Sequence, residues 1–185
     1  HNLAHQRSRV KLFEIGAQFV AALDGVRESA VIAGVAIGPR TAEHWDGASP
    51  DTDYFDVKGD VEALLARTGH GADFSFVAGT HPALAPGRTA QIIRGQEAVG
   101  WLGVLHPDLQ RRLDMKRAGT LFALQLDTAF AARVPAFRSY SKFPSIRRDL
   151  AVVVEESVAA DEVVQCVQSS SCAVLQHMTI FGIYR

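Results

Sequence analysis

Short apolar or alternating segments recur through the first two thirds of the chain, and they constrain the fold more than any other feature. Alternation of apolar and polar side chains over four to eight residues is typical of a half-buried strand, and a short apolar run bounded by turn residues is typical of a buried one. Because Gly95-Gln96-Glu97 separates two such segments, we expect a hairpin with a left-handed glycine there. The pattern predicts strands at 9–16, 30–37, 74–78, 89–94, 98–105 and 121–126.

Helical spacing is rarer in this part of the chain. Residues 56–67 place Val57, Val61, Leu64 and Leu65 on one stripe, with acidic residues before the stripe and a glycine after it. A shorter helix is expected at 107–113, because a proline at the first helical position is favourable. Many strands with few helices predict an α+β fold built on an antiparallel sheet.

The pattern changes after residue 133. Residues 134–144 contain two prolines and three aromatic side chains with little periodicity, which indicates a linker. Beyond it, a strand at 150–154, a helix with Val163, Val164 and Val167 on one face, and a strand at 174–184 are expected. This β-α-β order matches the first half of a β-α-β-β-α-β unit. We therefore expect two domains, 1–133 and 134–185, and a chain cut from something longer.

Composition excludes several functions. The chain has 185 residues, 48% hydrophobic and 21% charged, with a net charge of -1, so a polybasic, histone-like protein is excluded. No run of 18 apolar residues predicts a membrane span. Cys166 and Cys172 lie at a spacing that suits neither a disulfide framework nor a zinc site, and they fit a reducing cytosol.

Acidic residues and histidines gather in the middle of the sequence without a metal-site spacing. Asp46, Asp51, Asp53, Asp56 and Asp60 follow or flank His44, but no calcium-loop pattern is present. We expect a capped, solvated helix start there rather than a metal site. His81 and His106 each precede a proline and are interpreted as strand ends. The sequence also lacks a phosphate-binding glycine loop and a nucleophile elbow, so no catalytic or metal residue is nominated.

The segment 138–149 is the strongest functional signal from the residues themselves. Positive side chains there alternate with aromatic ones, and no acidic residue precedes Asp149. Cations neutralise phosphates and aromatic rings stack on unpaired bases, which favours RNA binding. A basic linker packed on the preceding domain is the alternative. The candidate RNA-binding residues are Arg138, Tyr140, Lys142, Arg147 and Arg148.

Six motifs in order and spacing resemble a known family. They are LFEIG at 12–16, EHW at 43–45, DYFDVKGDVE at 53–62, HPALAPG at 81–87, GWLGVLHPDL at 100–109 and FPSIRRDLAVVV at 143–154. Together they resemble the C-terminal third of the β subunit of bacterial phenylalanyl-tRNA synthetase. The resemblance implies a class II synthetase-like antiparallel sheet with flanking helices, followed by a truncated ferredoxin-like β-α-β piece of the anticodon-binding domain.

The resemblance also implies a function. Enzymes of that family are (αβ)2 heterotetramers that join phenylalanine to tRNA(Phe) with ATP and Mg²⁺ in the cytoplasm, with the chemistry in the α subunit. The class signature of alternating glycines ending in an arginine is missing, because Gly100–Leu105 runs into His106-Pro107. The chain is therefore expected to be noncatalytic, to hold no cofactor itself, and to serve subunit assembly and tRNA docking.

The aromatic side chains around the first helix suggest where a subunit would dock. Large aromatic residues are enriched at interfaces. On this basis the expected interface residues are His44, Trp45, Tyr54, Phe55 and Lys58, with core packing as the rival interpretation. Two alternatives to the synthetase hypothesis stay open. One is a standalone RNA- or protein-binding module, and the other is a small hydrolase or metalloenzyme that uses the histidine and aspartate residues.

Overall fold

The structure is a computed structural model that describes residues 7–23, 25–47, 49–69, 71–131, 137, 139, 142–170 and 174–184. The chain divides into two compact units, His1–Phe137 and Arg138–Arg185, and each is described by itself.

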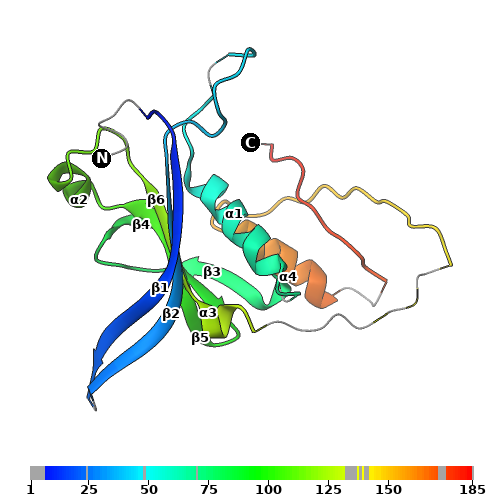
Figure 1. Cartoon of the computed structure of the whole chain (residues 1–185). Helices are drawn as coiled ribbons and strands as arrows, with labels where there is room; N and C mark the ends of the chain where they lie inside the picture. Colours follow the sequence, from blue (N-terminus) through cyan, green and yellow to red (C-terminus); the bar gives the residue numbers. More distant parts are fainter. Residues whose placement is uncertain are drawn as a thin grey trace. The chain divides into compact units, whose positions relative to one another are not determined.

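A six-stranded antiparallel sheet forms the frame of the first unit (Figure 1). Its spatial order is β1-β2-β6-β5-β4-β3, and every neighbouring pair runs antiparallel. The fold is thus α+β, as the sequence predicted. The strands are β1 (Val10–Ala22), β2 (Gly25–Ile37), β3 (Phe74–Ala78), β4 (Leu84–Arg94), β5 (Glu97–Leu105) and β6 (Thr120–Gln125).

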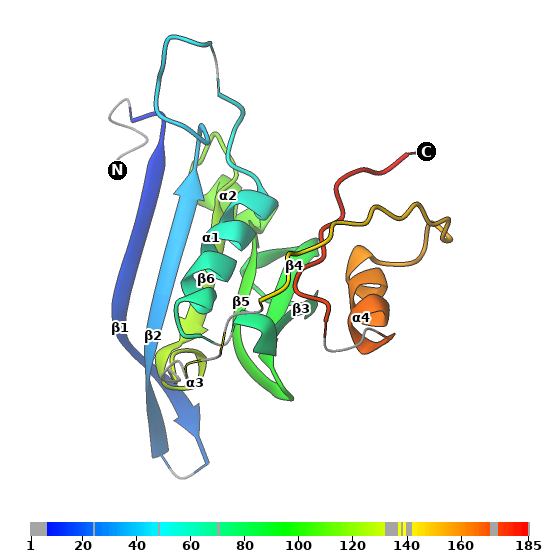
Figure 2. The same ribbon diagram turned by 90° about the vertical axis from the view of Figure 1, so that its right-hand side faces the viewer.

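The hairpin of β1 and β2 is longer than the sequence pattern predicted. It pairs without interruption from Val10 opposite Ile37 to Ala22 opposite Gly25. Only residues 31–36 of β2 pair with β6, so the far half of the hairpin projects beyond the sheet (Figure 2). The sequence has aspartate followed by glycine at 24–25, which is a strong hairpin signal. A hairpin turn predicted at this position would have lengthened both predicted strands.

Helix α1 (Tyr54–Ala66) lies over β5 and β6 on one face of the sheet (Figure 2). It begins two residues before the predicted start, because Asp53 and Asp56 form a reciprocal capping box. The predicted stripe is correct, since Val57, Val61 and Leu65 are buried. They pack with core residues from the sheet and from α3 (Leu126–Ala129): Ile32, Ala36, Ile92, Val99, Leu102, Leu124 and Ala129.

The remaining elements of the first unit follow the sequence pattern in part: β4 begins at Leu84, five residues before the predicted strand, and neither α3 nor a 3-10 helix was predicted. The β4–β5 hairpin turns at Gly95, whose φ of 62° is left-handed as predicted. A short 3-10 helix, η2 (Gly71–Asp73), precedes β3, and α2 (Pro107–Arg112) has Pro107 in its first turn. Gly34 lies where β2 meets β6, and a Cβ there would lie 2.5 Å from the Phe122 ring, so any other residue would displace that ring.

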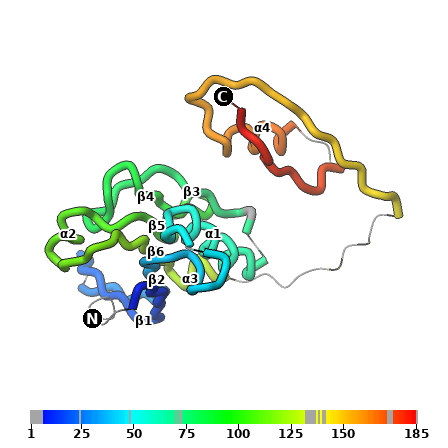
Figure 3. The backbone as a smooth tube through the Cα atoms, turned by 90° about the horizontal axis from the view of Figure 1, so that it is seen from above, coloured from blue at the N-terminus to red at the C-terminus, as the bar shows by residue number. Residues whose placement is uncertain are grey.

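The second unit contains a helix but, within its described residues, no strand (Figure 1). Figure 3 shows the coil of this helix, α4 (Ala160–Ser170). Helix α4 half-buries Val163, Val164 and Val167, as predicted. The predicted strands at 150–154 and 174–184 are wrong for this structure, because neither segment forms a ladder in it. In a β-α-β-β-α-β arrangement another strand lies between the first two, and these residues do not supply it.

Candidate assembly and RNA-binding surfaces

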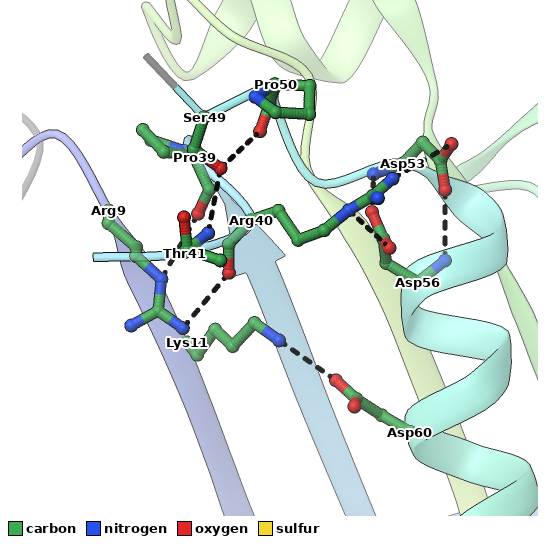
Figure 4. Close-up of polar contacts among 10 residues, drawn as sticks. All are labelled: Arg9, Lys11, Pro39, Arg40, Thr41, Ser49, Pro50, Asp53, Asp56 and Asp60. Atoms are coloured by element: carbon green, nitrogen blue, oxygen red, sulfur yellow. Dashed lines mark hydrogen bonds and ion pairs between the residues drawn. The ribbon is translucent and has the colours of Figure 1, made fainter. Parts of the chain in front are cut away.

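The acidic residues at the start of α1 are paired with cations from β1 and from the loop after β2 (Figure 4). The Nε of Arg40 lies 2.7 Å from the Oδ1 of Asp56, and its Nη2 lies 4.0 Å from the Oδ2 of Asp53. Lys11 on β1 reaches Asp60 one turn further along the helix, at 3.1 Å. These contacts tie the end of the long hairpin to the N-terminus of α1.

Hydrogen bonds hold the loop that carries Arg40, and Figure 4 shows several of them. Arg9 donates from Nε to the Pro39 carbonyl at 3.1 Å and from Nη2 to the Arg40 carbonyl at 3.4 Å. The Thr41 amide donates to the Ser49 hydroxyl at 3.0 Å, and Arg117 pairs with Asp51 at 2.9 Å. The loop is therefore a supported element rather than a loose connection.

Some of these contacts also shift the pKa of Asp56 in the capping box. The backbone N–H of Asp53 donates to the Asp56 carboxylate, and this bond, together with Arg40, lowers the pKa of Asp56 below its ordinary value despite some burial. Among the residues that the structure describes, no three His, Cys, Asp or Glu side chains converge as a metal site would require. The acidic residues at 51–60 thus stabilise the helix start and its neighbours.

Trp45 and Phe55 are two nominated interface residues whose large aromatic side chains are mostly exposed. Trp45 is 95% exposed in the loop after β2, and Phe55 is 74% exposed on α1. Next to Trp45, the Nδ1 of His44 accepts a hydrogen bond from the Asp46 amide at 3.2 Å. Exposed aromatic side chains of this size favour contact with a partner.

Tyr54 and Lys58 have structural roles on the same helix. Tyr54 packs against the core, and burial, aided by the negative charge of Glu62, raises the pKa of its hydroxyl. Lys58 forms an ion pair with Glu62, and its ammonium lies 4.6 Å from the centre of the Phe76 ring. The rival interpretation, packing within the unit, therefore describes Tyr54 and the Lys58 side chain better than exposure does.

The basic segment of the second unit is exposed where the structure describes it. Lys142, Arg147 and Arg148 are all exposed, whereas Arg138 and Tyr140 lie outside the described residues. Arg147 pairs with Asp149 at 3.2 Å, and its guanidinium lies 5.9 Å from the centre of the Phe181 ring. The structure thus brings an arginine and an aromatic ring together from two segments that are far apart in the sequence.

The β1–β2 hairpin carries an exposed apolar surface that the sequence interpretation missed. Phe13 and Phe19 on β1 are 72% and 65% exposed, and Val26 on β2 is 70% exposed. The outer edge of β1 pairs with no strand in the described part of the chain. Long exposed edge strands are normally covered or protected by charges, so this edge is suited to contact with a partner.

The fold and these surfaces define an α+β module with exposed aromatic and basic side chains and, among its described residues, no metal-ligand cluster. Comparison with known proteins gives the family. Residues 1–127 match the family described as the phenylalanyl tRNA synthetase beta chain CLM domain, and residues 141–185 match the ferredoxin-fold anticodon binding domain. The chain belongs to the phenylalanyl-tRNA synthetase β chain family.

Curated relatives agree along the whole chain. It is 40% identical over 185 residues to the phenylalanine--tRNA ligase beta subunit of Pseudomonas syringae and 43% identical to that of Pseudomonas putida. The corresponding subunit of Idiomarina loihiensis is 41% identical over 187 aligned residues. In each comparison all of this chain is covered but only 23–24% of the relative, so the chain spans about a quarter of the relatives' length. The comparisons give no support to a standalone binding module.

No helix among the described residues has both the length and the apolar character that crossing a bilayer requires.

Proposed function

We propose that this chain is the part of a phenylalanine–tRNA ligase β subunit that supports subunit assembly and tRNA binding. One observation carries the proposal: two domain families of that subunit match this chain in sequence, and relatives with that name are about 40% identical from its first residue to its last. The whole enzyme would form phenylalanyl-tRNA(Phe) from phenylalanine, ATP and tRNA(Phe) in the cytoplasm, as an (αβ)2 heterotetramer with its chemistry in the α subunit.

The architecture that we propose is the class II synthetase sheet followed by the ferredoxin-fold domain, with the boundary at 133/134. A six-stranded antiparallel sheet with α1 on one face supports the first part. The two family matches end and begin at residues 127 and 141, and the compact units divide at 137, so all three observations favour a boundary in this short stretch.

ATP and Mg²⁺ belong to the whole enzyme in this proposal, not to this chain. The residues present do not fit a magnesium site, because Asp51, Asp56 and Asp60 are each engaged by an arginine or a lysine. On α2, Arg111 is ion-paired with Asp108. The chain's own residues therefore bind and position partners.

Trp45 and Phe55 test the assembly role. A β subunit that carries Trp45→Ala and Phe55→Ala should lose affinity for the α subunit, because large exposed aromatic side chains dominate the energetics of interfaces. Co-purification with a tagged α subunit, followed by titration of the purified subunits, measures the change. Val77→Ala, at a 43% exposed site on β3, is the matched control for the loss of an exposed apolar side chain. Unchanged α-subunit affinity in the double variant would remove these residues from the interface.

Arg147 and Arg148 test the RNA role. Replacing both by alanine in the assembled enzyme should weaken tRNA binding and flatten its salt dependence, since each lost phosphate contact reduces the logarithmic slope by roughly 0.7–0.9. Arg111→Ala with Arg112→Ala removes the same charge from α2 and should leave the slope unchanged. Equal slopes for wild type and the Arg147/Arg148 variant would refute an RNA role for this segment.

A further inference from the structure

Three histidines in the described residues share one local hydrogen-bond pattern. In each, the ring Nδ1 accepts from the backbone N–H two residues further along, at 3.2 Å: His44 from Asp46, His81 from Ala83 and His106 from Asp108. In a neutral imidazole one ring nitrogen is the acceptor and the other carries the proton. The pattern therefore places the proton on Nε2 in all three rings.

Only two of these histidines face a common pocket. An open pocket of about 300 Å³ lies where the start of β4 meets the end of β5, and it is lined by Thr80, His81, Pro82, Leu84, Pro86 and His106. The two histidines are held in place by the backbone, because the His106 amide donates to the Ala83 carbonyl at 2.9 Å. His81 is held further by Trp101, whose ring centre lies 4.5 Å from that of the imidazole.

The hydrogen-bond pattern decides which ligand chemistry this pocket suits. A metal ion bound at Nε2 requires the proton on Nδ1, where it would oppose the backbone N–H that Nδ1 now accepts. With the proton on Nε2, each of these two rings carries an N–H donor, and Thr80, which also lines the pocket, carries a hydroxyl donor. Two prolines and Leu84 supply apolar wall beside them.

The charge around the pocket favours a singly charged ligand over a doubly charged one. The donors are imidazole N–H groups, and the Asp108 carboxylate lies 3.8 Å from the Nδ1 of His106, where it also pairs with Arg111. A doubly charged phosphate would meet this carboxylate without a cation in the pocket lining, whereas a singly charged carboxylate needs only two convergent donors.

We propose that His81 and His106 form a binding site for a carboxylate that carries an apolar group, with the two Nε2–H groups donating to its oxygens. The carboxylate comes either from a free small acid or from an acidic side chain of a polypeptide. Neither the family match nor the proposed assembly surfaces assign these residues, and the inference does not depend on the proposed function.

Nuclear magnetic resonance of the full chain tests the site without any substitution. Long-range ¹H–¹⁵N correlation should show the Nε2–H form for His81 and His106, and titration with isovalerate should shift both rings saturably. His44 has the same local pattern outside the pocket, so its ring should not respond. An Nδ1–H form for either pocket histidine, or no saturable shift up to about 100 mM, a weak-binding limit, overturns the proposal.

Asparagine substitutions then isolate the Nε2–H groups. The asparagine side-chain oxygen keeps an acceptor for the backbone N–H, whereas the Nε2–H donor is lost. His81→Asn and His106→Asn should each weaken isovalerate binding about tenfold or more, since a hydrogen bond to a charged group is at stake. His177→Asn, in the second unit, is the control for loss of a histidine. Undiminished binding in both pocket variants overturns the proposal.

The remaining probes distinguish the source and the class of the ligand. Isovalerate should bind more tightly than acetate, because the apolar wall contacts its branched chain. A capped glutamate peptide that binds as well as isovalerate supports a polypeptide source, and one that binds more weakly supports a free acid. Inorganic phosphate that competes at lower concentration than either carboxylate overturns the assignment of ligand class.

Discussion

The two units of this chain contain similar strand-forming segments, yet among the residues that the structure describes only the first unit has a sheet. In the first, Ile92, Leu102 and Leu124 are fully buried between the sheet and α1. In the second, no described residue is buried, and Leu150 and Val153 are 82% and 101% exposed. Both regions carry the β-branched and apolar residues that strands favour. The difference is the availability of pairing partners, because a strand is stabilised by its neighbours across the ladder.

Helix α4 forms without the pairing partners that a strand needs. A helix satisfies its backbone within one segment, so α4 forms between two segments that have no ladder. Its three valines are only half-buried, however, whereas Val57, Val61 and Leu65 of α1 are buried against the sheet. Local pattern therefore sets where a helix forms, and tertiary partners set how much it stabilises.

The largest expected difference in the free energy of unfolding is between two leucine-to-alanine substitutions, one in each unit. Leu102→Ala should lower the free energy of unfolding of the first unit by about 2–5 kcal/mol, because it leaves a cavity in the core. Leu150→Ala should change it by less than about 0.5 kcal/mol. Both tryptophans, Trp45 and Trp101, lie in the first unit, so urea unfolding followed by tryptophan fluorescence measures it. Comparable losses for the two variants would show that the contrast between the units is wrong.

A pair of glycines tests how closely the first unit is packed. A Cβ on Gly100 in β5 would lie 2.2 Å from the Ala123 carbonyl oxygen, so Gly100→Ala should destabilise by about 1–3 kcal/mol. Gly59 in α1 has open space around the same position. Gly59→Ala should therefore stabilise the helix by about 0.5–1 kcal/mol. The same measurement serves both variants, and effects of equal sign would contradict the packing described here.

Much of the first unit's fold was predictable, because its strands end at strong local signals. The strand at 74–78 and the turn at Gly95 are confirmed, since a glycine follows the first and sits at the left-handed position of the second. The extension of the β1–β2 hairpin was missed because residues 17–22 alternate poorly. The strands predicted at 150–154 and 174–184 failed for a different reason: a sequence pattern shows the capacity to pair but not the partner.

The candidate site was predictable in part. Exposure of Trp45, Phe55 and Arg148 agrees with a binding role, which stays a prediction. Core packing of Tyr54 was left open as an alternative because the helix was expected to begin at 56; a start at Tyr54 places this ring on the same stripe as Val57 and Val61. His81 and His106 were interpreted as strand ends, and only the register of β4 against β5 brings them to one pocket.

The capping box of α1 offers a smaller effect that tests local stabilisation. Asp53→Ala removes the acceptor for the Asp56 amide, now 2.9 Å away, and should lower the free energy of unfolding by about 0.5–2 kcal/mol. Asp53→Asn keeps a side-chain acceptor at the cap and should retain most of the stability. Urea unfolding of the two variants measures the difference. If asparagine proves as damaging as alanine, the pairing of Asp53 with Arg40, rather than the cap, stabilises this end of the helix.

The smallest effect is a pH dependence that belongs to the first unit. The pKa of Asp56 is lower in the folded chain than the ordinary value of about 3.9, so the unfolded chain binds more protons as the pH falls. The stability that the charged Asp56 contributes is therefore complete above about pH 4 and is lost as the pH falls through the lower, folded-state pKa. Asp56→Asn removes that titration, so wild type should exceed the variant in stability at pH 6, and the margin should shrink toward pH 3. Urea midpoints at the two pH values measure the margin. A margin independent of pH would mean that the geometry of the hydrogen bond from the Asp53 amide, which the substitution alters without any titration, stabilises the start of α1, rather than the carboxylate charge beside Arg40.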